Sequence, residues 1–179
     1  LSTLAANVGV AIQNARLYRD SQRRAGEMAA LVDVASEISA MLELRPVIER
    51  IAERAQTLLG GDTSAVFLAD AEGRSSPALV ALGSLADAVM ALAIEPGQGI
   101  LGDLVRRGAA EAVNDTTADP RTLIIEGTSP DEHDRLMAAP LLARGAGAGR
   151  MAVWRSQTAP TFTDADLAFL VSLSQQAAI

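Results

Sequence analysis

The sequence predicts an α+β protein, and two observations support this prediction. Apolar residues recur at three- and four-residue spacing near both ends of the 179-residue chain, which is the period of a helix that packs along one face. Between these ends, short segments with a period of two are joined by tight turns such as Asp70-Ala71-Glu72-Gly73, which indicates antiparallel strands. We therefore expect a central antiparallel sheet with helices at both ends of the chain.

The composition excludes several classes of protein. Hydrophobic residues make up 49% of the chain and charged residues 21%, which is typical of a folded domain. The sequence has 0 cysteines and 1 histidine, which excludes a disulfide framework, a redox or catalytic cysteine and a multi-histidine metal centre. The net charge of −7 argues against a nucleic-acid-binding surface. Charge or glycine interrupts every apolar run before about 18 residues, so we expect no membrane span.

The first 26 residues differ in charge from the rest of the chain. They carry four arginines and one aspartate, a balance of 4 − 1 = +3, whereas residues 27–179 carry 11 arginines and 21 acids, a balance of −10. The apolar stripe of a helix runs through Leu1, Leu4, Val8, Ala11, Ala15 and Tyr18, and a second stripe runs through Leu31, Val34 or Ala35, Ile38 and Leu42. The two stripes differ in heptad phase. This change fits either a stutter within one long helix or a break between two helices at Gly26.

The helices that follow are bounded by proline, glycine and capping residues. Pro46 is expected to end the first helical element and to open a second helix, which Gly60-Gly61 terminates. Short helices are expected over 85–92 and 100–106, with Gly108 ending the second. Thr163-Asp164-Ala165-Asp166 resembles a capping box and opens a last helix.

The strands are expected where the period is two. These segments are 63–69, 78–82, 111–113, 136–143 and 151–156. Residues 114–134 are polar and show little periodicity, so we expect a long loop there. Gly147-Ala148-Gly149 is expected to form an unusually small and flexible turn. Residues 170–179 can be aligned with residues 1–10, which predicts that the chain begins within the kind of helix in which it ends, as a piece of a tandem array does.

Six segments occur in an order that a known family shares. They are the helix 45–59, Ala65-Val66-Phe67-Leu68, the segment 96–102, Asn114-Asp115 with Asp119-Pro120-Arg121, Ala139-Pro140-Leu141-Leu142, and the segment 162–167. In this arrangement residues 31–179 resemble a GAF domain, the small-molecule sensor module of signalling proteins. The resemblance implies a central antiparallel sheet of about six strands, with terminal helices on one face and short helices and a ligand pocket on the other. It also implies that residues 1–26 are the end of a preceding GAF-type helix with a helical linker. Residues 27–179 are then a GAF domain whose last helix is cut short at residue 179.

Two motifs have alternative interpretations. Gly97-Gln98-Gly99-Ile100-Leu101-Gly102 matches the glycine-rich dinucleotide fingerprint, but Pro96 and the hairpin connections argue against the parallel strand that a fingerprint needs. We interpret it as a turn into a helix whose amides, by the resemblance, face the pocket and hold an anionic ligand. His133 lies among three acids and is interpreted as a solvated loop residue. A haem ligand needs an apolar surround, so haem at His133 is not favoured; a pH-responsive site and a hard-cation site stay open.

The resemblance narrows the function further. Without lysine the cyclic-nucleotide signature is missing, and without cysteine neither bilin attachment nor the chemistry of methionine-sulfoxide-reducing relatives is available. The family layout places the pocket at Met90, Ile94, Gly99, Ile100, Leu104, Asp115, Arg121 and Met137. Trp154 is expected in the core. We expect neither a catalytic constellation nor a metal site.

The resemblance predicts a regulatory sensor domain of a cytoplasmic signalling protein of bacterial type, not an enzyme. It would bind an unidentified small effector and relay the ligand state through flanking helices to an output domain outside this chain. That output domain would be a histidine kinase, a nucleotide cyclase or a phosphodiesterase. The N-terminal helices would form a coiled-coil homodimer, with no nucleic-acid partner. The alternative is a ligand-free GAF module that serves for dimerisation and spacing.

Overall fold

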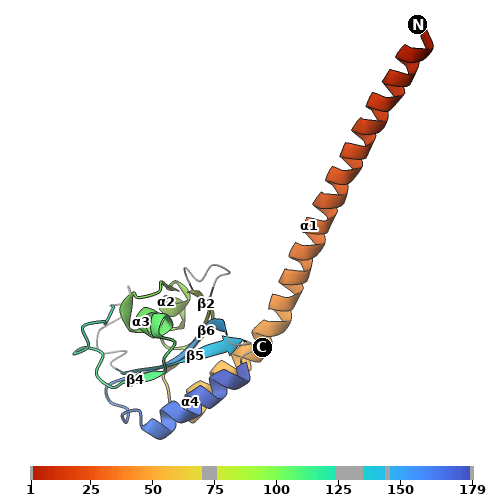
Figure 1. Cartoon of the computed structure of the whole chain (residues 1–179). Coiled ribbons are helices and arrows are strands. Elements are labelled where there is room, and N and C mark those ends of the chain that lie inside the picture. The colour runs from red at the N-terminus through yellow and green to blue at the C-terminus, as the bar shows by residue number, and fades with distance from the viewer. Residues whose placement is uncertain (1, 70–75, 124–134, 144–145, 178–179) are drawn as a thin grey trace. The chain divides into compact units, whose positions relative to one another are not determined.

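A computed structural model describes residues 2–69, 76–123, 135–143 and 146–177 (Figure 1). The chain divides into two compact units, Leu1–Leu44 and Arg45–Ile179, and each is described by itself. Within the described residues, no helix has both the length and the apolar character that crossing a membrane requires. The expected turn at residues 70–73 and His133 lie outside the described residues.

The first helix, α1 (Ser2–Leu58), runs through Gly26 and Pro46 without interruption. The expectation that Pro46 ends a helix is therefore wrong. Proline removes one backbone hydrogen bond and leaves the carbonyl four residues earlier without its donor. Both Pro46 and Leu42 are exposed, so water can hydrate that carbonyl group. The change in heptad phase near Gly26 accordingly lies within one continuous helix, as a stutter does.

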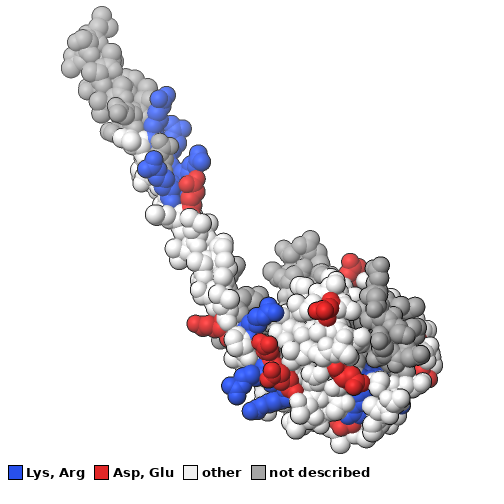
Figure 2. Space-filling view, turned by 180° about the vertical axis from the view of Figure 1, so that it is seen from behind, with Lys and Arg blue, Asp and Glu red and all other residues white. Residues whose placement is uncertain are grey.

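The first unit presents an apolar stripe to solvent. Leu31, Ile38 and Leu42 are 69%, 56% and 67% exposed. Figure 2 shows the arginines gathered on one stretch of the helix, followed by a stretch whose visible face carries almost no charge. In a single chain this stripe is left in contact with water, which makes it a surface that association would bury.

The second unit is built on one six-stranded antiparallel sheet, which confirms the predicted α+β class. Its strands are β1 (Thr63–Leu68), β2 (Ser76–Gly83), β3 (Ala93–Ile94), β4 (Glu111–Val113), β5 (Arg135–Ala143) and β6 (Ala146–Arg155). Their order across the sheet is β3-β2-β1-β6-β5-β4. The short strand β3 has no periodic signal of its own and was not expected; it pairs with the beginning of β2.

The glycine-rich segment before Met151 is strand rather than turn. Gly147 pairs with Leu142 and Gly149 pairs with Leu141, with a register shift between the two pairs. The expectation of a flexible turn here is wrong, because both glycines pair with β5 and Gly149 also pairs with Leu68 of β1. A side chain at Gly149 would collide with the backbone carbonyl of Phe67, so glycine lets the two strands approach each other.

The terminal helices cover one face of the sheet (Figure 1). The last turns of α1 bury Ile48, Ala52 and Ala55, and the Ser64 hydroxyl of β1 donates to the Ala52 carbonyl at 2.9 Å. The final helix, α4 (Asp164–Ala177), buries Leu170. Its start is the predicted capping box, which two reciprocal hydrogen bonds between residues 163 and 166 confirm.

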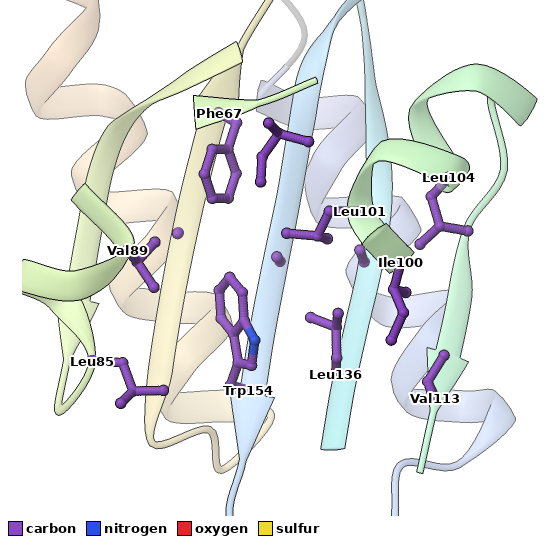
Figure 3. Packing of buried hydrophobic residues seen from close by; sticks show 13 residues of the cluster. Phe67, Leu85, Val89, Ile100, Leu101, Leu104, Val113, Leu136 and Trp154 are labelled. Atoms are coloured by element: carbon purple, nitrogen blue, oxygen red, sulfur yellow. The ribbon is translucent and has the colours of Figure 1, made fainter. Parts of the chain in front are cut away.

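The short helices α2 (Ala86–Met90) and α3 (Gly99–Arg107) lie over the other face. Phe67, Leu136 and Trp154 point toward them, because side chains alternate between the faces of a strand. Figure 3 shows Trp154 between Leu85 on one side and Leu136 on the other. Helix α3 ends at Gly108 in the left-handed conformation, with φ of 60°, as the sequence predicts.

Candidate functional site

A cavity of about 290 Å³ lies between the beginning of α3 and the sheet. Strand β3 and the loop after β4 form its sides, and side chains from β5 and β6 form its floor. The lining residues are Leu92, Ala93, Ile94, Gln98, Gly99, Ile100, Leu101, Thr116, Thr122, Leu123, Leu136 and Trp154. We call this space the first cavity. Its lining is mostly apolar, with polar groups supplied by Gln98, Thr116 and Thr122.

The glycine-rich motif forms the turn that leads into α3. Gly97 and Gly99 have φ of 85° and 69°, a backbone conformation that residues with a Cβ rarely adopt. Gly102 lies against the Glu95 carbonyl, where a Cβ would collide, and its own carbonyl accepts a 2.7 Å hydrogen bond from the Gly97 amide. The three glycines therefore serve a tight turn and a close helix contact, which confirms the interpretation as a turn into a helix.

The beginning of α3 is electropositive. Gln98 is its N-cap residue in an extended conformation, and among the described residues no side-chain hydrogen bond caps the first amides. The first turn also carries no acidic residue. Uncapped amides at a helix N-terminus carry a partial positive charge, so a hydrogen-bond acceptor is favoured there.

The loop after β4 is held by its own polar groups. The exposed Asp115 carboxylate accepts hydrogen bonds from the Thr117 hydroxyl at 2.7 Å and from the Ala118 amide at 3.0 Å. The Thr122 hydroxyl donates to the Thr116 carbonyl and closes the loop beside the first cavity. The hydrogen bond from the Thr117 hydroxyl, followed by that from the Ala118 amide, lowers the pKa of Asp115.

Arg121 joins this loop to α3 and β4. Its guanidinium forms ion pairs with Asp119 at 2.7 Å, with Asp103 at 2.8 Å and with Glu111 at 2.8 Å. Arg106 and Arg107 also pair with Asp103, and Arg107 pairs with Glu111, so three arginines face three carboxylates and the charges balance. The hydrogen bond from Arg121 is the largest cause that lowers the pKa of Asp103, to about 2. We call these six residues the Arg121 network; Arg121 directly precedes Thr122, which lines the first cavity.

Acid is expected to weaken the fold through this network. Because the folded pKa of Asp103, about 2, lies below its ordinary value of 3.8, the ionised carboxylate stabilises the fold above pH 3.8. That contribution is lost as the pH falls from 3.8 toward 2. The pKa values of Glu111 and Asp119 are lowered in the same direction, mainly by hydrogen bonds from Arg121.

This effect is measured by the free energy of urea unfolding of the wild type and the Arg121→Gln variant, from neutral pH down to the acidic range in which Asp103 takes up its proton. The variant is expected to be less stable at neutral pH and to lose less stability in acid. Arg106→Gln is the matched control, since the more exposed Arg106 contacts only Asp103 of the network. Equal pH dependence of Arg121→Gln and wild type would contradict the assignment.

The structure brings together some of the predicted pocket residues and separates others. Ile94, Gly99 and Ile100 line the first cavity. Leu104 lies further along α3 and lines a second cavity, Met90 is 41% exposed at the end of α2, and Asp115 and Arg121 belong to the loop described above. Met137 is fully buried on the sheet face that α1 and α4 cover, because its neighbours Leu136 and Ala138 occupy the cavity face.

Several lining residues were missed by the sequence analysis. Trp154, expected only in the core, is 3% exposed and also forms part of the cavity floor. The alternation along β6 could have placed it there, since Trp154 shares a face with Ala152. Thr116, Thr122 and Leu123 lie in a stretch without periodicity, so no sequence signal marked them.

Comparison with known proteins identifies the family. The family model described as GAF domain matches residues 42–179, which is more than half of the chain. The match begins within α1 and includes all six strands, both cavities and α4.

Solved structures with the same fold come from proteins of different kinds. The second GAF domain of DevS from Mycobacterium smegmatis is 22% identical, covers 75% of this chain and 89% of its own, and has a TM-score of 0.61. Residues 122–287 of a methyl-accepting chemotaxis protein are 17% identical over 78% of this chain and 91% of theirs, with a TM-score of 0.64. Free methionine-R-sulfoxide reductase from Neisseria meningitidis, solved with its substrate, is 18% identical. The match covers 78% of this chain and 80% of the reductase, with a TM-score of 0.64. At these identities the likeness shows the fold.

Proposed function

Because this chain belongs to the GAF domain family, a module found in signalling proteins, we propose that it is a regulatory domain that binds a small metabolite in the first cavity. The observation that carries the proposal is the cavity itself. It is largely apolar, with a few polar groups at the uncapped beginning of α3, which is the usual character of a small-molecule site. A chain with 0 cysteines has no thiol to offer for redox catalysis, which supports regulation over catalysis.

The ligand that fits this lining is a neutral aromatic or branched aliphatic metabolite with one hydrogen-bond acceptor. Leu92, Ile100, Leu136 and Trp154 would pack against its apolar body. The amides at the beginning of α3 would donate to its acceptor atom. The described lining of the first cavity contains no arginine to pair with a phosphate, so a nucleotide is disfavoured.

A chain of contacts supports a relay from this cavity to the terminal helices. Thr116 lies in the wall of the first cavity, and Asn114 precedes it by two residues. The Asn114 side chain bridges to the segment that precedes α4. Its amide nitrogen donates to the Phe162 carbonyl at 2.9 Å, and its oxygen accepts from the Phe162 amide at 2.7 Å. A shift of the cavity wall would therefore move the backbone at the beginning of α4.

The relay continues through Arg155 to α1. The Arg155 guanidinium lies 4.1 Å from the centroid of the Phe162 ring, and its Nε donates to the carbonyl of Leu59, just after α1, at 2.8 Å. Ligand binding would favour one arrangement of these contacts and so shift the population of helix packings. The output domain would then respond through α1 or α4.

The exposed stripe of α1 supports association of two copies of this chain. Leu31 and Ile38 are one heptad apart, and two such helices side by side would bury the stripe in a coiled coil. We place the domain in a dimeric cytoplasmic signalling protein of bacterial type, with residues 1–26 as the end of a preceding GAF-type helix and a linker. The second candidate function, a ligand-free module for dimerisation and spacing, uses the same stripe with the first cavity unused.

Native mass spectrometry of the chain separates the two functions, because it reports stoichiometry and bound mass together. With p-cresol and 4-hydroxybenzaldehyde as probes, whose oxygen atoms can accept a hydrogen bond, we expect a dimer that retains one probe per chain. Leu123→Trp should abolish retention, since Leu123 contacts Gly99 at the cavity and tryptophan would fill this space. Leu58→Trp, at an exposed leucine of α1, is the matched control and should retain the probe. A dimer that retains none of the probes would favour the spacer function.

A further inference from the structure

Arg150 is a buried cation without an anionic partner among the described residues. It lies on β6 and is 4% exposed. Its Nη1 donates to the Leu101 carbonyl at 2.9 Å and its Nη2 to the Ser76 hydroxyl at 3.3 Å, while its Nε has no hydrogen-bond partner. Both partners are neutral. Burial lowers the pKa of Arg150 to about 10, so the guanidinium is still charged at neutral pH.

Within the part of the chain that the structure describes, no opposite charge offsets the free energy that burial of this charge costs. A buried ion is strongly disfavoured unless an opposite charge and hydrogen bonds compensate for the lost water. Arg121 is compensated by three carboxylates, and Arg155 has a carboxylate within 3.8 Å as well as its carbonyl acceptors. Arg150 differs because a cavity lies beside it, which an anion from solution can enter.

The second cavity has a volume of about 450 Å³ and lies at the end of α3, whereas the first cavity lies at its beginning. Leu104 and Val105 of α3 form one wall, Ala138 and Pro140 of β5 form another, and Arg150 lies between them on β6. Apolar side chains of α3 and β5 therefore lie on both sides of the Arg150 charge. Arg106 and Arg107 also border this space, but the Arg121 network already neutralises them.

We propose that the second cavity is a separate site for a small organic monocarboxylate, whose carboxylate pairs with Arg150. One unpaired positive charge calls for a ligand with one negative charge. The surrounding apolar side chains call for an apolar body attached to it. This site is independent of the first cavity, so failure of one proposal leaves the other standing.

Benzoate is a suitable probe, and benzamide is its uncharged counterpart of nearly the same shape. Thermal unfolding of the chain is expected to show a midpoint that rises steadily with benzoate concentration and does not change with benzamide. Binding to the folded state alone raises stability in proportion to the logarithm of ligand concentration, which gives the dissociation constant. Equal effects of benzoate and benzamide, or no effect of benzoate, would overturn the proposal.

Three variants locate the site. Arg150→Met should weaken benzoate binding by about thirtyfold or more, the usual result of removing one member of a buried charge pair. Val105→Phe fills the cavity without removing the charge and should also abolish the response, which covers the case in which Arg150→Met does not fold. Arg106→Gln removes a neutralised arginine from the same space and should leave binding unchanged.

Two further results would contradict the site as drawn. If Leu123→Trp abolishes the benzoate response and Val105→Phe does not, benzoate binds in the first cavity and the proposal fails. If inorganic phosphate stabilises the chain as strongly as benzoate, the site needs no apolar body and the organic ligand class is wrong.

Discussion

Replacing Arg155 by methionine is expected to lower the free energy of unfolding by about 3–5 kcal/mol. Arg155 is 7% exposed and holds three parts of the second unit together. It donates to the Leu59 carbonyl at the end of α1 and to the carbonyls of Pro160 and Thr161 at 3.0 and 3.2 Å. Methionine fills much of the same volume but donates nothing, so these carbonyls lose their partner.

Urea unfolding at neutral pH measures this loss. Arg106→Met is the matched control, because the Arg106 side chain is 65% exposed and an exposed ion pair contributes less than about 1 kcal/mol. A loss in Arg155→Met no larger than the control would show that the carbonyls find other donors, and Arg155 would then have no part in joining α1 to α4.

A double-mutant cycle tests whether Arg155 acts together with the cavity wall. Asn114→Ala removes the side chain that bridges to Phe162, on whose ring Arg155 lies. If the two side chains belong to one network, the cycle is expected to give a coupling free energy of about 0.5–3 kcal/mol. Additive losses would separate the cavity wall from the terminal helices and contradict the relay.

The elements that the sequence predicts well are those that depend on local physics. Gly108 ends α3 because only a residue without a Cβ easily adopts its left-handed conformation, and the capping box at Thr163 needs only residues three apart. Pro46 does not end the helix, although its local penalty predicts an end there. The helix is long, and the carbonyl group that proline leaves without a donor is exposed to water.

The candidate site was harder to predict because its residues depend on register and on distant partners. Along β5, Leu136 lines the cavity, and the next residue, Met137, lies on the opposite face of the sheet. Because this segment is apolar on both faces, its sequence does not indicate which residues face the cavity. Arg121 and Arg150 look alike in sequence. One is compensated by carboxylates from α3 and β4 and the other is buried beside a cavity, which only the tertiary structure determines.

Replacing Trp154 by alanine is expected to cost about 3–5 kcal/mol of unfolding free energy, because a large buried side chain is removed from the core. The void would not be isolated, since Trp154 already borders the first cavity. Indole has the shape of the missing side chain and can enter through this space. We therefore expect indole to stabilise Trp154→Ala more than it stabilises the wild type.

Val153, the neighbour of Trp154 on β6, provides the matched control for this prediction. Val153 is fully buried, but it points to the face that α1 and α4 cover. Val153→Ala leaves a void too small for indole, so indole should stabilise this variant no more than the wild type. For Trp154→Ala, a tenfold excess of indole over its dissociation constant adds about 1.4 kcal/mol. Equal rescue of both variants would mean that indole binds away from the void at Trp154. Rescue of neither would mean that the first cavity is closed to a ligand of this size, and the sensor function would lose its main support.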